Sequence, residues 1–362
     1  MRQIAVLSLL LAAALAASYW TWTADVKEAP KSGDTKVALY AATEDELQKL
    51  HWESKELSVD VERRKDARGA YSWVDATERK EKKEAKAPPK PPAAEGEEID
   101  PAEPAEPTPT AEPAAPIPEP AAEAPKEIET KHTSFRGGDA ADTLWKDFAP
   151  LHALRELVIP AGADLATFGL AEPSAKVTVT RGGTTQEIEI GGETYGAKDR
   201  YIRTNGKVYL LAQDTTRALE FASTRLVERR VQPFVEDKLD RIDATLPDGR
   251  SLGLVQTNKD DKEKAFWAKA DAPTDKYSAG DAWVTKLLKL SVRLYAEEPA
   301  APLTSRLTWV ATSEGESWKV ELLSSTSDPI EWFIRSEYDR ALVTLTPTQA
   351  SVAVSELEEL LQ

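Results

Sequence analysis

Residues that could carry out chemistry are few in this chain, and they are widely spaced. There is no cysteine, and the three histidines are His51, His132 and His152. Metal sites need ligands at matched spacing, and neither an HExxH motif nor a His-x-His pair occurs. We interpret His51 as a strand residue, His132 as a neighbour of a low-complexity segment and His152 as part of a helix. We expect none of them to bind a metal.

Other catalytic patterns are also missing from the sequence. It contains no GxSxG nucleophile motif, no Walker-type phosphate loop and no DxDxDG calcium loop. The glycine pairs at 182–183 and 191–192 are typical of hairpin turns, and the acidic run at 260–263 of a solvated turn. We therefore assign no catalytic, cofactor-binding or metal-binding residue and expect that the protein is not an enzyme. A hydrolase stays open as an alternative, which would need a concave pocket with converging polar groups.

Composition limits the partners. The 362 residues suffice for two ordinary domains, and the formal net charge is −16. An acidic surface repels phosphate backbones, so we do not expect nucleic acid as a partner. The absence of cysteine excludes disulfides, thiolate nucleophiles, cysteine-ligated clusters and the acylated cysteine of a bacterial lipoprotein.

The N-terminus has the pattern of an export signal. Arg2 precedes a long apolar run, and the aromatic residues Tyr19, Trp20 and Trp22 follow it. A small-x-small triplet at the end of the run would suit a cleaved signal peptide. The length of the run and the aromatic belt favour an uncleaved signal anchor over residues 1–24. The positive-inside rule then predicts a single-pass protein of the bacterial inner membrane with its bulk in the periplasm.

A low-complexity segment interrupts the chain over residues 77–131. It begins with a Lys/Glu run and continues as a Pro/Ala/Glu-rich stretch that holds more than half of the 24 prolines. Proline at this density blocks helices and sheet ladders, and few apolar residues remain to bury. We predict a disordered surface loop, either a simple spacer or a tether.

The remaining sequence contains a weak internal repeat. Residues 45–78 resemble 237–271, and 175–221 resemble 305–354, each with the period-two alternation of strands. We predict an α+β fold of two tandem copies of a mainly antiparallel β-meander module with packed helices.

The first predicted copy covers 37–76 and 132–230, with the low-complexity loop inserted, and the second covers 233–362. Each copy should contain three strands, a helix, four strands and a closing helix. We expect Asn205-Gly206 to form a type I′ hairpin turn.

Helix positions follow from apolar spacing and capping residues. In the first copy, the three- and four-residue spacing predicts a helix with a kink at Pro150; its apolar residues are Leu144, Phe148, Leu151, Leu154 and Leu157. We expect Asp281 and Asp214 to cap later helices. Thr346-Pro347 should open the last helix.

Tryptophan is abundant, with ten residues. We expect most of them to pack in cores, although some could form an exposed aromatic face, and Trp309 and Trp318 could share one face of a sheet. Strands should carry Trp52, Trp73, Trp267, Trp309, Trp318 and Trp332, and helices Trp145 and Trp283.

Several of these segments resemble the bacterial domain-of-unknown-function family numbered 4340. The resemblance rests on the short strand around Trp73, on FGLAEPSAKVTV at 168–179 and on RYIRTNGKVYLL at 200–211. Members of that family usually carry an N-terminal membrane segment and are often encoded beside ABC-type transport components of the gliding-motility type. The family has no established reaction, so the resemblance implies an accessory role in the cell envelope, possible contact with ABC-type transporter subunits, and no cofactor.

Two functions are therefore expected. The first is a non-enzymatic, membrane-anchored cell-envelope protein that serves as an accessory or interaction component of an ABC-type envelope transport system. The alternative is a periplasmic protein that binds cell wall or polysaccharide through exposed aromatic side chains and the proline-rich loop.

Overall fold

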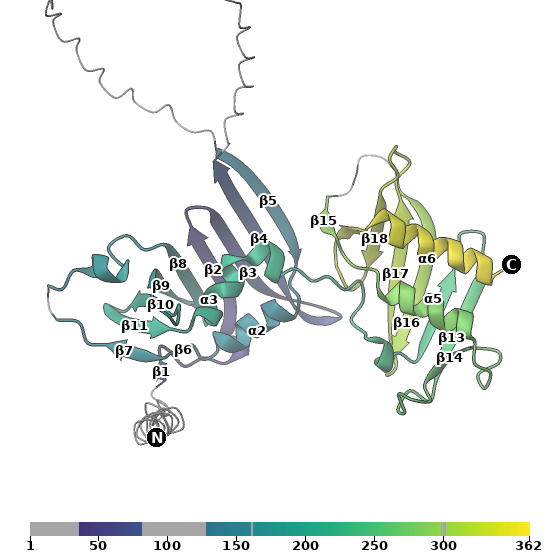
Figure 1. The fold of residues 1–362 in the computed structure, drawn as a ribbon, viewed down its shortest axis with the longest axis horizontal. Coiled ribbons are helices and arrows are strands. Elements are labelled where there is room, and N and C mark those ends of the chain that lie inside the picture. Colours follow the sequence, from purple (N-terminus) through teal and green to yellow (C-terminus); the bar gives the residue numbers. More distant parts are fainter. Residues whose placement is uncertain (1–35, 82–127, 161, 298, 300–301) are drawn as a thin grey trace, which may run out of the picture.

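Antiparallel strands dominate the computed structural model, which describes residues 36–81, 128–160, 162–297, 299 and 302–362. Two large sheets lie side by side along the long axis of the molecule, and helices pack against each (Figure 1). The expectation of a mainly antiparallel fold with a few packed helices is confirmed. Residues 1–24, where the sequence predicts an anchor, lie outside the described ranges.

The first sheet has nine strands, all paired antiparallel. Their spatial order is β5 (Ile128–Arg136), β4 (Gly69–Glu81), β3 (Leu57–Asp66), β2 (Leu47–Ser54), β8 (Ala175–Arg181), β9 (Thr184–Glu193), β10 (Arg200–Thr204), β11 (Lys207–Leu211) and β7 (Arg155–Leu157). Its helical elements are η1 (Glu44–Glu46), α2 (Asp139–Asp147), η2 (Leu165–Phe168), α3 (Gln213–Glu220) and α4 (Ala222–Arg225). A separate two-stranded sheet pairs β1 (Val37–Ala38) with β6 (His152–Ala153).

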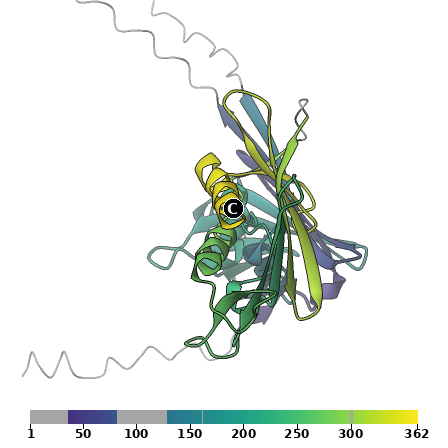
Figure 2. The ribbon, with the colours of Figure 1, turned by 90° about the vertical axis from the view of Figure 1, so that its right-hand side faces the viewer.

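The second sheet has eight strands, also antiparallel. Their order is β14 (Phe266–Lys269), β13 (Ser251–Thr257), β12 (Arg241–Thr245), β16 (Thr304–Ser313), β17 (Glu316–Ser324), β18 (Trp332–Ser336), β19 (Leu342–Thr344) and β15 (Leu294–Ala296). The helical elements are η3 (Glu236–Lys238), α5 (Ser278–Leu288) and α6 (Pro347–Leu360). Helices α5 and α6 lie together on one face of this sheet (Figure 2).

The two sheets follow the same path through space. Eight strands of the first sheet and the eight strands of the second have the same spatial order when they are numbered along the chain. The orders are β4-β3-β2-β8-β9-β10-β11-β7 and β14-β13-β12-β16-β17-β18-β19-β15. The first sheet adds β5 at its edge. Each sheet also gains a short strand after its first helix, β7 or β15, which the sequence did not predict.

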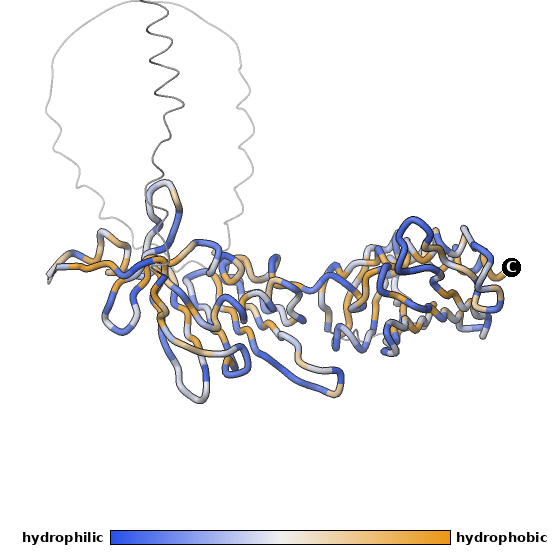
Figure 3. The backbone as a smooth tube through the Cα atoms, turned by 90° about the horizontal axis from the view of Figure 1, so that it is seen from below, coloured by the Kyte–Doolittle hydropathy of each residue, from blue (hydrophilic) through white to orange (hydrophobic). Residues whose placement is uncertain are grey.

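Alternating apolar residues place one face of each sheet against its helices. In β2, Leu47, Leu50 and Trp52 are buried, and in β16 the buried residues include Leu307 and Trp309. Because side chains alternate between faces, these residues form a continuous apolar layer under the helices. Two separate large cores result, one for each sheet. Hydrophilic segments mark many of the turns that join the strands (Figure 3).

Six of the eight tryptophans in the described ranges are buried, and all eight lie on the predicted type of element. The buried ones are Trp52, Trp145, Trp267, Trp283, Trp309 and Trp318. Trp309 pairs with Val320, and Trp318 pairs with Ala311. Directly opposed residues point to the same side of a sheet, so Trp309 and Trp318 share a face, as predicted.

Tight hairpin turns appear where glycine permits them. The β10–β11 turn has Asn205 at φ 50° and Gly206 at φ 75°, the left-handed conformation at both positions that a type I′ turn requires. The turns at Gly182-Gly183 and Glu314-Gly315 have positive φ at both positions as well, and they join equivalent strand pairs in the two sheets.

The predicted limits of the low-complexity loop were too wide. β4 continues to Glu81, and β5 begins at Ile128, with Glu78 opposite Lys131. Residues 77–81 and 128–131 are therefore strand. The charged side chains of this hairpin can point to solvent on both faces, because the strands are held together by their backbone hydrogen bonds. His132 lies in β5 rather than beside a loop. The remainder, 82–127, lies outside the described ranges.

The helix expected over 144–157 was wrong beyond Asp147, where α2 ends. Residues 152–157 form β6 and β7 instead, so His152 is a strand residue. Pro150 cannot continue a helix, and the apolar spacing after it reflects packing on a sheet edge.

The predicted caps were partly wrong. α5 starts at Ser278 and α3 at Gln213, so Asp281 and Asp214 lie in the first helical turn, where their charge favours the helix N-terminus without capping it. Thr346 occupies the N-cap position of α6, and Pro347 is its first residue, as predicted.

None of the helices within the described residues is both long and apolar enough to cross a lipid bilayer.

Candidate functional site

The three histidines are not brought together. His51 lies on β2 with its Nδ1 2.7 Å from Oδ1 of Asp60, and His132 lies on β5 with its Nδ1 3.2 Å from the hydroxyl of Thr77. His152 is exposed on β6. No group of three His, Cys, Asp or Glu residues arranged for a metal ion occurs in the described part of the chain.

A concavity of about 750 Å³ lies in the first module beside the β10–β11 hairpin. Its cationic residues are already paired: Lys207 with Glu156 at 3.0 Å, and Arg203 with Glu189. Glu187, also in the lining, pairs with Lys176 at 3.2 Å. The charges therefore run along the strands as cross-strand pairs and do not converge on a common point.

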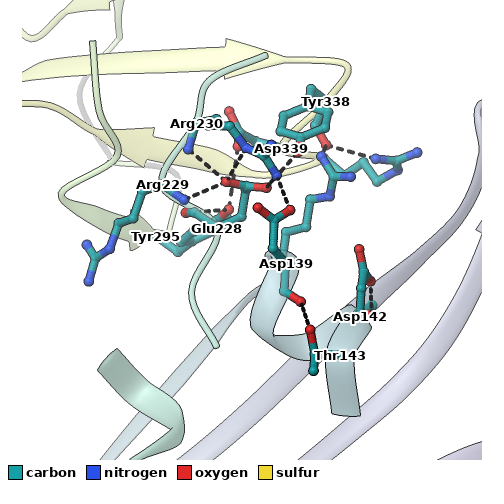
Figure 4. Close-up of polar contacts among 12 residues, drawn as sticks. Asp139, Asp142, Thr143, Glu228, Arg229, Arg230, Tyr295, Tyr338 and Asp339 are labelled. Carbon is teal, nitrogen blue, oxygen red and sulfur yellow. Dashed lines mark hydrogen bonds and ion pairs between the residues drawn. The ribbon is translucent and has the colours of Figure 1, made fainter. Parts of the chain in front are cut away.

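A denser polar arrangement lies where the two modules meet. We call it the junction cluster, and Figure 4 shows most of it. It is made of Arg136, Glu228, Arg230, Tyr295, Ser336, Tyr338 and Asp339. Arg136 ends β5 of the first sheet, Glu228 and Arg230 lie on the connection between the modules, and the other members belong to the second module.

Glu228 is the centre of this cluster and is only 4% exposed. Its carboxylate accepts hydrogen bonds from the backbone N–H groups of Arg229 and Arg230, at 2.8 and 2.9 Å. The Arg230 guanidinium donates to both carboxylate oxygens, at 3.1 and 2.8 Å, and the Tyr338 hydroxyl donates at 2.6 Å. Burial alone would raise the pKa of Glu228, but these donors outweigh it and hold the pKa below its ordinary value.

Arg230 extends the network to the first module. Its Nη2 lies 2.6 Å from Oδ1 of Asp139, the first residue of α2. The two carboxylates raise the pKa of the guanidinium further, so Arg230 stays charged. The pair with Glu228 is thus well solvated by protein groups, which is the condition for a buried ion pair to be tolerated.

Arg136 reaches from the first module to the second. Its guanidinium carbon lies 3.4 Å from the centre of the Tyr338 ring, and its Nη1 donates to the Tyr338 carbonyl at 2.9 Å. Stacking of this kind suits the flat guanidinium. Burial raises the pKa of Tyr338, and the nearby Glu228 carboxylate adds to the effect, so the phenol keeps its proton.

Asp339 is fully buried beside this contact. Its Oδ2 accepts from the Ser336 hydroxyl at 2.7 Å, and its backbone N–H donates to Ser336 Oγ at 2.9 Å. The Tyr295 hydroxyl lies 3.4 Å from its Oδ1. Burial raises the pKa of Asp339 to about 7, although the Ser336 hydrogen bond and the Arg136 charge oppose the shift.

Further contacts surround the junction cluster at the tip of the β3–β4 hairpin. Asp66 pairs with Arg340, at 3.0 Å from Oδ1 to Nη2, and Arg68 pairs with Glu337. The Arg68 guanidinium also lies over Trp318, and Arg340 lies over Tyr71. These contacts join the first module to the turn between β18 and β19.

Aromatic packing completes the junction. The rings of Phe135 and Tyr295 lie 6.1 Å apart, and Tyr295 packs against both large cores. The junction thus combines apolar contact with ion pairs and stacked arginines. Chemically, the junction can hold the two sheets in one arrangement, and it includes one buried carboxyl group, Asp339, whose pKa burial raises to about 7.

Sequence reasoning missed every residue of this cluster. Two local signals were present: the charged run Glu228-Arg229-Arg230 between the two repeats, and Tyr338-Asp339-Arg340 at a turn. In sequence, neither run can be distinguished from a solvated turn, because its burial depends on the surface of the other module.

Comparisons with known proteins add one finding. No curated protein and no solved structure matches the chain. A family model matches residues 139–308, which extend from α2 across the connection between the modules to β16. Within this range, Gly169 has φ 65°, and a side chain there would meet the backbone of Gly192 at 2.6 Å, so the FGL element of the predicted family motif requires glycine. The matching model is that of the family described as domain of unknown function (DUF4340), so it supports the resemblance that the sequence predicted.

Proposed function

We propose that the chain is a non-enzymatic, membrane-anchored protein of the cell envelope that acts as an accessory or interaction component of an ABC-type transport system. The observation that carries the proposal is that the charged groups at the junction and beside the concavity are already paired with one another. In the described residues, Glu228 and Arg230 are consumed in joining two modules, and the concavity beside Lys207 and Arg203 has its cations paired. A junction of this kind holds the outer surfaces of the two modules at a defined distance from each other, which suits binding to a partner protein.

The apolar N-terminal pattern supports the anchor. Residues 1–24 combine a basic start, an apolar run and an aromatic belt, which together favour a single-pass segment with the bulk of the chain in the periplasm. A rigid pair of modules close to the membrane surface would suit contact with the outer part of a permease.

We further infer that the two modules are copies of one ancestral unit. The shared strand order and the equivalent tight turns at Gly182-Gly183 and Glu314-Gly315 support this. The core of the second module draws only on residues 231–361, so residues 231–362 produced alone should fold. A two-dimensional NMR spectrum with dispersed amide signals would agree, and an unfolded spectrum would contradict the inference.

The test of the function uses the full chain with a C-terminal tag in a Gram-negative bacterium. Membranes are washed with alkaline carbonate, cross-linked, solubilised in mild detergent and captured by the tag. We expect the chain to stay in the washed membranes with an intact N-terminus and to recover ABC-type permease subunits. The matched control replaces residues 1–24 by a cleaved signal peptide, which should release the protein to the periplasm.

Two results would contradict the proposal. Release of the full chain by carbonate would contradict the membrane anchor. Recovery of the chain without any transporter subunit would contradict the proposed partner. The alternative, a cell-wall or polysaccharide binder that uses exposed aromatic side chains and the proline-rich loop, stays a prediction. We favour the first function because six of the eight described tryptophans are buried.

A further inference from the structure

The junction cluster contains one phenolic proton between two acceptors. The Tyr295 oxygen lies 3.4 Å from Asp339 Oδ1 and 3.4 Å from the carbonyl oxygen of Glu228. A tyrosine hydroxyl has one hydrogen, so it can donate to only one of them at a time. When Asp339 is ionised, either its carboxylate or the Glu228 carbonyl is left without the hydrogen bond from Tyr295. This is unfavourable because Glu228 and Asp339 are both buried.

A second proton, on Asp339 itself, completes the network. The carboxylic O–H then donates to the Tyr295 oxygen, and Tyr295 donates to the Glu228 carbonyl. The other Asp339 oxygen continues to accept from Ser336, whose Oγ accepts from the Asp339 backbone N–H. Protonation thus makes a continuous chain of hydrogen bonds from the β18–β19 turn, through β15, to the connection between the modules.

Charged groups face Asp339 from every element packed against it. Arg136 from β5 attracts an ionised Asp339, and the Glu228 carboxylate repels it. Arg230 is occupied by Glu228 and Asp139, and Tyr338 donates its proton to Glu228. Arg136 is therefore the one cation of the junction cluster that acts directly on Asp339, and burial still dominates.

We propose that the junction is a proton-dependent latch, in which the two modules dock tightly when Asp339 carries a proton and loosen when Asp339 is ionised. The coupling arises because the completed hydrogen-bond chain ends on Glu228, whose side chain and neighbouring backbone join the modules. This inference concerns the whole soluble part and does not depend on the anchor or on any partner.

The direction of the pH effect follows from proton linkage. The docked pKa of Asp339 is about 7, raised from 3.8. We take Asp339 to be reached by water in the loosened form, so that between these values the docked form holds a proton that the loosened form lacks. Docking is therefore strongest at acidic pH, weakens as pH rises towards about 7, and changes no further above it. One linked proton changes the docking equilibrium by up to about tenfold per pH unit in this window.

The test measures the distance between the modules in the full chain. Because the chain has no cysteine, Thr185→Cys and Ser355→Cys introduce one spin label in each module, both at exposed positions. We expect a narrow distance distribution at pH 5.5 that broadens as pH rises towards 7 and changes little above it. Asp339→Asn, which is neutral at every pH, should stay narrow to pH 8.5. Glu321→Gln, on β17 away from the junction, should keep the pH response of the parent protein.

Two outcomes would overturn the latch: a parent protein whose distribution is the same at pH 5.5 and 8.5, or an Asp339→Asn variant that broadens as the parent does. If Asp339→Asn fails to fold, hydrogen exchange of the parent decides. Protection of the Arg229 and Arg230 amides, relative to core amides of Leu50 and Val320, should fall about tenfold or more between pH 5.5 and 8. Constant relative protection would reject the proposal.

Discussion

The hairpins β10–β11 and β18–β19 occupy the same place in the strand order of their sheets, yet they end differently. The first closes with two residues, Asn205 and Gly206, in a tight turn. In the second, five residues connect Ser336 to Leu342, and they include Glu337, Tyr338 and Arg340. The longer turn supplies three of the side chains that contact the first module.

This difference shows that a turn can vary in length where the strand order around it is the same. The strands and the helices keep the same order because their apolar faces must meet, whereas a turn at the end of a hairpin is free to lengthen. In the second sheet, the longer β18–β19 turn forms part of the docking surface through Tyr338 and Arg340. The first module contributes the complementary surface with its additional strand β5 and the long β3–β4 hairpin.

The largest expected effect comes from the paired helix tryptophans, which test whether each module has its own core. Trp145 on α2 donates to the Ser72 hydroxyl at 2.9 Å, and Trp283 on α5 donates to the Ala353 carbonyl at 2.9 Å. Either Trp→Ala change should lower the unfolding free energy of its own module by about 3–5 kcal/mol. Urea unfolding followed by hydrogen exchange would locate the loss. Equal loss of protection in both modules would contradict independent cores.

The next effect concerns the centre of the junction cluster. Glu228→Ala removes the acceptor of five hydrogen bonds and leaves Arg230 with Asp139 as its remaining anionic partner. We expect a loss of about 3 kcal/mol, measured by urea unfolding. Glu321→Ala is the matched control, because this carboxylate lies on β17 away from the junction and should have little effect. A loss below about 1 kcal/mol for Glu228→Ala would mean that the ion pair is unimportant.

A loop exchange tests the comparison directly. Replacement of Glu337–Arg340 by Asn-Gly copies the β10–β11 turn onto the β18–β19 hairpin. The second module should remain folded, while the docking of the modules loses about 1–2 kcal/mol with the contacts of Tyr338 and Arg340. Small-angle scattering should report a wider range of shapes. An unchanged scattering profile would show that the longer turn is not what joins the modules.

The smallest effect is an acid response at the rim. The Arg340 guanidinium holds the pKa of Asp66 at about 2, below its ordinary 3.8. The ion pair therefore stabilises the docked form above pH 3.8, and this stabilisation is lost as pH falls towards 2. Asp66→Asn should remove only this part of the acid unfolding curve, measured by circular dichroism against pH. A curve identical to that of the parent would show that the contact contributes nothing.

Much of the fold could be predicted from the sequence because it depends on local periodicity. The alternation around Leu50 and Trp52, and around Leu307 and Trp309, specifies strands with one buried face. Asn205-Gly206 specifies a turn by its own backbone preferences. Errors occurred where a local pattern was ambiguous: the spacing from Leu144 to Leu157 fits a helix, yet Pro150 ends it and a sheet edge buries the remainder.

The sequence by itself therefore determined most of the strands, the tight turns and the resemblance to a family. The tertiary structure alone decided the junction, because Arg136, Glu228 and Asp339 are far apart in the chain and each follows local rules that suit any solvated turn. Their burial depends on two folded surfaces meeting. A carboxyl group acquires its altered proton affinity only from that burial and from the charges that the fold brings to it.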